Sequence, residues 1–107
     1  MISTHILDLG LGRPASLVPV GLEKMTEEGW VTLMEQKTNQ DGRIEFQNKP
    51  EAGIFRLVFK TNEYFKNQGK DIFFTEVPVI FEISNIDRKY HIPLLVNQFG
   101  YSTYRGS

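Results

Sequence analysis

VPVIFEI, residues 77–83, indicates the fold class, because its apolar side chains recur at every second position. The odd positions from Val77 to Ile83 are all apolar, whereas Glu82 falls on the opposite face. A period of two is typical of a β-strand with one buried face, whereas an α-helix repeats every ~3.6 residues. This stretch therefore predicts a strand that covers a hydrophobic core.

Other stretches alternate in the same way. Even positions of residues 90–96 and odd positions of residues 55–59 are apolar, and residues 2–7 alternate near the start. Turn-forming residues such as Gly, Pro, Asn and Asp divide these runs. They lie in residues 10–14, 27–29, 39–42, 48–50 and 97–100. Short strands separated by frequent turns predict an all-β sandwich of about seven or eight strands.

One segment departs from this pattern. Residues 61–69, TNEYFKNQG, place Thr61 or Asn62 where a helix could be capped and Gly69 where it could end. We therefore expect a single short helix within the β-sandwich.

Length and composition narrow the class of protein. A chain of 107 residues is expected to form a single domain, residues 1–107. Its formal net charge is -1, which disfavours nucleic acid or an anionic membrane as a partner. There is no membrane-length apolar run and no signal-like start. The absence of cysteine excludes disulfides and thiolate chemistry, and it fits a cytoplasmic protein.

The outward faces of the terminal strands are less polar than a solvated face should be. If Ile2 and Thr4 point inward, His5 points outward beside Leu7, and His91 likewise points outward near Leu95. This face could be an interface or a binding surface. Single surface leucines are common, however, so an ordinary exposed face is the alternative.

The candidate chemistry rests on few residues. His5 and His91 are the only histidines, and histidine can accept and return a proton near neutral pH. Arg13, Arg43 and Arg105 could clamp a planar substrate that carries carbonyl or carboxylate oxygens. The alternative is that the histidines are structural or lie on an ordinary surface, and that the arginines are solvated charges. We find no hydrolase elbow, phosphate loop or metal-ligand spacing, so we expect neither a metal nor a cofactor.

Both ends of the chain resemble the transthyretin-related family, and specifically its 5-hydroxyisourate hydrolase branch. Residues 3–8 (STHILD) with 12–15 (GRPA) are similar to its opening signature. Residues 90–95 (YHIPLL) with 101–107 (YSTYRGS) are similar to its closing signature, and residues 38–43 (TNQDGR) match its central turn. The terminal Tyr-Arg-Gly-Ser is the most specific element.

The resemblance implies two four-stranded sheets, one short helix, and a homotetramer whose dimers meet across the sheets that hold the terminal strands. It implies hydrolysis of 5-hydroxyisourate to 2-oxo-4-hydroxy-4-carboxy-5-ureidoimidazoline during urate degradation, with water activated by a histidine. The implied catalytic residues are His5, Arg43 and His91. The implied substrate-binding residues are Tyr104, Arg105, Gly106 and Ser107.

Several alternatives stay open at this level. Either histidine could be the general base, and Ser107 could be a nucleophile, although a terminal hydroxyl is poorly held unless it is packed. The chain could be a small-molecule carrier like the thyroid-hormone-binding branch of the same fold, because fold alone does not define function. It could also be a β-sandwich interaction module in which the histidines are incidental.

Overall fold

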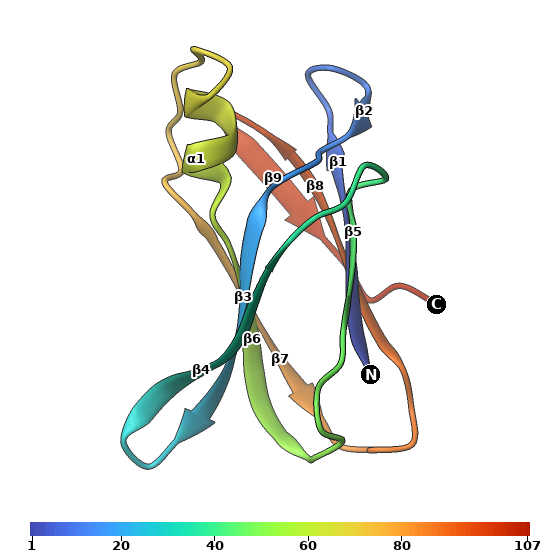
Figure 1. Ribbon diagram of the computed structural model, residues 1–107. Coiled ribbons are helices and arrows are strands. Elements are labelled where there is room, and N and C mark those ends of the chain that lie inside the picture. Colours follow the sequence, from blue (N-terminus) through green and yellow to red (C-terminus); the bar gives the residue numbers. More distant parts are fainter.

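A computed structural model describes residues 1–107 (Figure 1). The chain forms nine strands and one short helix. The elements are β1 (Ile2–Asp8), β2 (Arg13–Pro14), β3 (Pro19–Thr26), β4 (Gly29–Lys37), β5 (Arg43–Phe46), β6 (Gly53–Phe59), α1 (Thr61–Lys66), β7 (Val77–Ile83), β8 (Tyr90–Asn97) and β9 (Gly100–Thr103).

The strands form two layers. One sheet has the order β4-β3-β6-β7, and the other has the order β2-β1-β8-β9 with β5 also paired to β1. β2 pairs with Leu7 and Asp8, whereas β5 pairs with Ile2–His5, so the two short strands share one edge of β1 end to end. The predicted sandwich of two four-stranded sheets is therefore confirmed, except that five strands fill the four positions of the second sheet.

The predicted alternation of inward and outward faces is confirmed on the terminal strands, except that Pro93 of β8, which was expected to point outward, is buried. In β1, Ile2, Thr4 and Ile6 are buried, and the residues between them are half-buried. The buried even positions of β8 face the same core, which is built from both sheets. Thr4, the polar member of this row, donates its hydroxyl to the Ile92 carbonyl at 2.6 Å. This bond satisfies the buried hydroxyl and joins β1 to β8.

The short helix lies where it was predicted, but its cap differs. Thr61 does not cap the helix because its side chain is buried; Lys60 occupies the N-cap position without a side-chain cap bond. Gly69 follows the helix with a positive φ of 68°, as expected for a residue that ends a helix. The Tyr64 hydroxyl donates to Asp8 Oδ2 at 2.7 Å, and this bond ties the helix to the end of β1. Burial, followed by this carboxylate, raises the pKa of Tyr64 to about 12.

No helix of the structure has the length and apolar character needed to cross a membrane.

The turn before β5 is built around Asn39 and Gly42. Asn39 Oδ1 accepts hydrogen bonds from the backbone N–H groups of Asp41 and Arg43, and Ile6 donates its N–H to the Gly42 carbonyl. Gly42 has a φ of 72°, and a Cβ placed there would lie 2.6 Å from the Ile6 carbonyl oxygen. Only glycine fits this position, and the turn therefore sets where Arg43 begins β5.

Gly42→Ala is expected to lower the free energy of unfolding by more than about 2 kcal/mol, because the clash with Ile6 adds to the strain of the left-handed backbone. Gly12→Ala is a matched control, since Gly12 has a φ of 68° and nothing within 4 Å of its Cβ position. That variant should lose about 1–2 kcal/mol from backbone strain alone. Urea unfolding followed by circular dichroism measures both, and equal losses would contradict the role given to the Ile6 contact.

Candidate active site

The candidate site lies on the outward face of the sheet that contains β1. β5 runs antiparallel to β1 and pairs Arg43 with His5, whereas β8 runs parallel to β1 and pairs His91 with Ser3. Because alternate residues of a strand share a face, Ser3 and His5 stand in successive rows on the same side of β1. The register therefore brings together residues that are far apart in the sequence.

The C-terminal residues complete this face. After β9, the N–H of Gly106 donates to the His91 carbonyl at 2.8 Å and forms an isolated bridge with β8. A Cβ at Gly106 would lie 2.5 Å from Cδ2 of the His91 ring, so the tail packs directly against the imidazole. The absence of a side chain at Gly106 is what allows this close approach.

A polar cavity of about 250 Å³ opens at this point. Ile44 is the only hydrophobic residue in its lining. The cavity includes the predicted residues Arg43, His91, Gly106 and Ser107, together with Ser3, Thr4, Glu45 and Lys89. Sequence reasoning did not select these last four as site residues, although Ser3 and Glu45 alternate in phase with the candidates on their own strands.

The environment of the histidines favours their neutral forms. Burial, followed by the positive charge of Arg43, lowers the pKa of His5 below its ordinary value of 6.5. Burial lowers the pKa of His91 in the same way, and the charges of Arg43 and then His5 lower it further. Both shifts favour the neutral imidazole at pH 7, and a neutral imidazole offers one unprotonated nitrogen that can accept a proton.

The remaining candidates do not line this cavity. Tyr104 and Arg105 line a second cavity of about 230 Å³, which also includes His91. The Arg105 guanidinium carbon lies 5.2 Å from the centre of the Tyr90 ring. His5 pairs with Arg43 but belongs to the lining of neither cavity.

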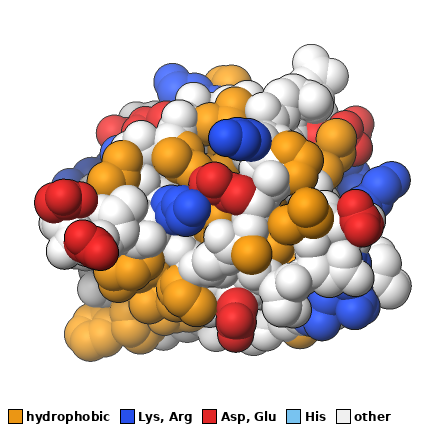
Figure 2. Space-filling view, turned by 90° about the horizontal axis from the view of Figure 1, so that it is seen from below, with side chains coloured by type: hydrophobic (Ala, Val, Ile, Leu, Met, Phe, Trp, Pro, Cys, Tyr) orange, Lys and Arg blue, Asp and Glu red, His pale blue; other side chains and the backbone are white.

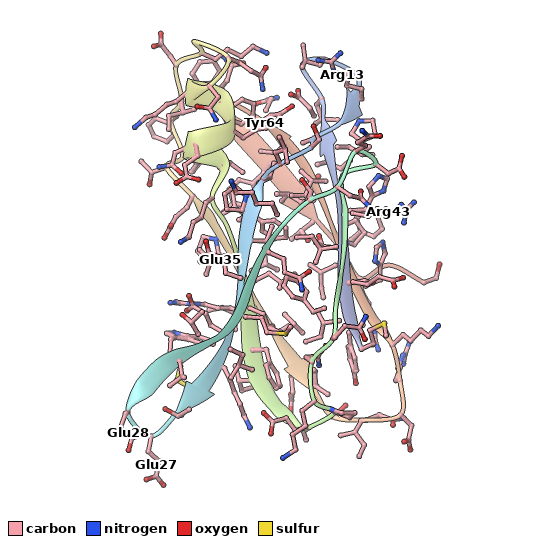
Figure 3. All side chains as sticks on the ribbon, viewed as in Figure 1. Arg13, Glu27, Glu28, Glu35, Arg43 and Tyr64 are labelled. Carbon is pink, nitrogen blue, oxygen red and sulfur yellow. The ribbon has the colours of Figure 1, made fainter.

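Arg13, which sequence analysis also considered, lies away from the candidate site. Arg13 pairs with Asp8 near the opposite end of β1, and Figure 3 shows it well separated from Arg43. The end of the molecule seen from below mixes hydrophobic side chains with charges of both signs, and no histidine side chain is visible on it (Figure 2).

No cluster of three or more His, Cys, Asp or Glu side chains is arranged to hold a metal ion.

Comparisons with known proteins show the family to which the chain belongs. A 5-hydroxyisourate hydrolase from Salmonella dublin is 48% identical over 110 residues, which cover 100% of this chain and 81% of that protein. The structure of Klebsiella pneumoniae 5-hydroxyisourate hydrolase matches with a TM-score of 0.86 and 37% identity, over 99% of this chain and 92% of that one. Sea bream transthyretin in complex with thyroxine matches with a TM-score of 0.88 and 31% identity, over 98% and 93% of the two chains. Residues 2–106 match the HIUase/Transthyretin family, and the chain belongs to that family.

Proposed function

We propose that this protein is a 5-hydroxyisourate hydrolase of urate degradation, formed by a single domain of residues 1–107. The observation that carries the proposal is the meeting of His5, Arg43 and His91 on one sheet face beside a polar cavity. The relatives named as 5-hydroxyisourate hydrolases support the choice of substrate.

The proposed reaction opens a cyclic amide of the substrate with one water molecule. The water oxygen bonds to the amide carbonyl carbon, the carbon–nitrogen bond breaks, and the departing nitrogen gains a proton. The product is 2-oxo-4-hydroxy-4-carboxy-5-ureidoimidazoline. A neutral histidine is suited to take the proton from water, because it is unprotonated at the working pH.

The charged and terminal residues have complementary proposed roles. Arg43 would orient the heterocycle and stabilise the negative charge that develops on the carbonyl oxygen. Gly106 and Ser107 would shape the cavity beside His91, and Tyr104 and Arg105 would shape the adjoining one. A cavity of about 250 Å³ suits a small heterocycle, since pockets for drug-sized ligands begin at about 300 Å³.

A carrier function fits this site less well. An iodinated phenol needs an apolar pocket, and Ile44 is the only hydrophobic residue that lines the cavity beside Arg43. The adjoining cavity is more hydrophobic, but Tyr104 and Arg105 form part of its wall and would obstruct such a ligand. Binding of thyroxine measured by calorimetry would distinguish the carrier from the hydrolase.

We further propose that the protein works in the cytoplasm as a homotetramer. The outward face of β1 and β8 carries the half-buried Leu7 and Leu95, which pair across the two strands one row beyond His5. Covering this face by a second copy would remove apolar surface from water and close the cavity. Analytical ultracentrifugation should give a mass of four chains; a monomer at micromolar concentration would contradict the assembly.

The test of the reaction is the ultraviolet absorbance of 5-hydroxyisourate generated in place from urate by urate oxidase. Adding this protein should accelerate the loss of substrate above its spontaneous decay. Ser16→Ala is a suitable control, because Ser16 is a half-buried loop serine that lines neither cavity. Decay at the spontaneous rate from a folded protein would overturn the assignment.

The pH dependence of kcat/KM should follow the histidines. Because the pKa values of His5 and His91 lie below 6.5, the neutral bases persist below that pH, and activity falls only as the pH drops through the lowered pKa. Arg43→Gln removes one of the causes that lower these pKa values. In this variant the fall of kcat/KM at acid pH should therefore occur at a higher pH, closer to 6.5. Burial, the larger cause, remains, and the shift should be partial. If kcat/KM of the variant falls at the same pH as that of the unmodified protein, Arg43 does not lower the pKa values of the histidines.

A further inference from the structure

Ser3 has a contact that the mechanism above does not use. Its hydroxyl oxygen lies 2.8 Å from Nδ1 of His91, within a half-buried part of the site. The parallel register of β1 and β8 pairs these two residues directly. A hydroxyl can either donate to Nδ1 or accept from it, so this contact alone leaves the tautomer of His91 open.

The surroundings of the ring indicate the direction of the bond. Nδ1 is engaged by Ser3 and Cδ2 packs against Gly106, so Nε2 is the ring nitrogen that remains available to a water molecule. A neutral imidazole has one unprotonated nitrogen, so Nε2 can act as a base only when the proton is on Nδ1. In that tautomer Nδ1–H donates to the Ser3 hydroxyl.

We propose that Ser3 is a positioning residue that holds His91 with its proton on Nδ1, so that the bare Nε2 is the general base of the reaction. The Ser3 hydroxyl accepts from Nδ1–H. The nitrogen on the far edge of the ring is then unprotonated beside the cavity that Arg43 and Ser107 also line. The assignment of the base, and with it the tautomer, rests on the proposed hydrolase function, whereas the contact between Ser3 and His91 does not.

Gly106 holds the ring from its other edge. Rotating the imidazole by half a turn would exchange Nδ1 with Cδ2, lose the bond to Ser3, and bring a polar N–H to the place where Gly106 packs closely on Cδ2. A side chain fixed on both edges keeps Nε2 in one direction, which is the condition for efficient proton transfer.

The proton balance closes with this tautomer. As the water oxygen bonds to the carbonyl carbon, one water proton moves to Nε2, and His91 becomes an imidazolium. Its Nδ1–H still donates to Ser3, and the bond is stronger because the donor is now charged. When the carbon–nitrogen bond breaks, the proton passes from Nε2 to the departing nitrogen. His91 returns to its starting state, and the other water proton stays with the new carboxyl group.

The experiment compares Ser3→Ala with Ser3→Thr, which keeps the hydroxyl on a residue well suited to a strand. Ser16→Ala is the control for loss of a serine. Nitrogen-15 NMR of the imidazoles reads the tautomer directly, and the spectrum is simple because the chain has two histidines. The unmodified protein should show the Nδ1–H form of His91, and Ser3→Ala should show a population with the proton on Nε2.

The kinetic expectation is a tenfold fall in kcat for Ser3→Ala, about the effect of one lost hydrogen bond, with KM nearly unchanged. Ser3→Thr should restore most of the loss, and Ser16→Ala should match the unmodified protein. The proposal is overturned if His91 carries its proton on Nε2 in the unmodified protein, or if Ser3→Ala changes neither tautomer nor kcat. Absence of turnover in an unmodified protein with the Nδ1–H form would instead reject the hydrolase function alone.

Discussion

His91→Asn is expected to lower kcat for 5-hydroxyisourate hydrolysis by at least about 100-fold, the smallest usual contribution of a general base. Asparagine is shorter than histidine and cannot accept a proton from water at neutral pH. Its amide can still bond to Ser3, so the strand pairing of β8 with β1 should survive. The measurement is the steady-state absorbance assay, with circular dichroism and sedimentation to verify the fold and assembly.

His5→Asn provides the comparison for this variant. If His91 is the base and His5 binds the substrate, both variants should lose activity. Only His91→Asn should remove the fall of kcat/KM at acid pH that follows the lowered pKa of His91. Full turnover by both variants would exclude the histidine mechanism.

Gly106→Ala is expected to lower kcat/KM by about 100-fold, the loss typical of misplacing a reacting group by about 1 Å. The added Cβ would lie 2.5 Å from Cδ2 of His91 and 3.2 Å from its carbonyl oxygen. Either the imidazole or the C-terminal tail must move. The first displacement shifts Nε2 of His91, and the second shifts Ser107. The tail is largely exposed, so the core and the unfolding midpoint should change little.

Gly100→Ala is the matched control for this prediction. Gly100 begins β9, and a Cβ there would meet only Asn97 Oδ1, at an ordinary contact distance of 3.9 Å. Activity of this variant should stay close to that of the unmodified protein. Equal activity of Gly106→Ala and the unmodified protein would show that the tail does not hold His91 in place.

Much of the fold follows from the order of side chains along the strands. The alternation in residues 2–7 and 90–96 correctly placed His5 and His91 on outward faces, because a strand repeats every two residues whatever its neighbours are. The helix at residues 61–66 was predicted by the break in that period. Its cap was not, because burial of Thr61 in the core outweighs the local preference of threonine for the N-cap.

The site depended on long-range pairing. The sequence itself determined the strand faces, the turn before Arg43, and the family resemblance carried by the two ends. Only the tertiary structure decided that β1 lies between β5 and β8 in a register that sets Arg43 beside His5 and Ser3 beside His91. Strand order and register depend on contacts between distant segments, and a local pattern contains no information about which strands will meet. That is why Ser3, an unremarkable residue in the sequence, is part of the site in the folded protein.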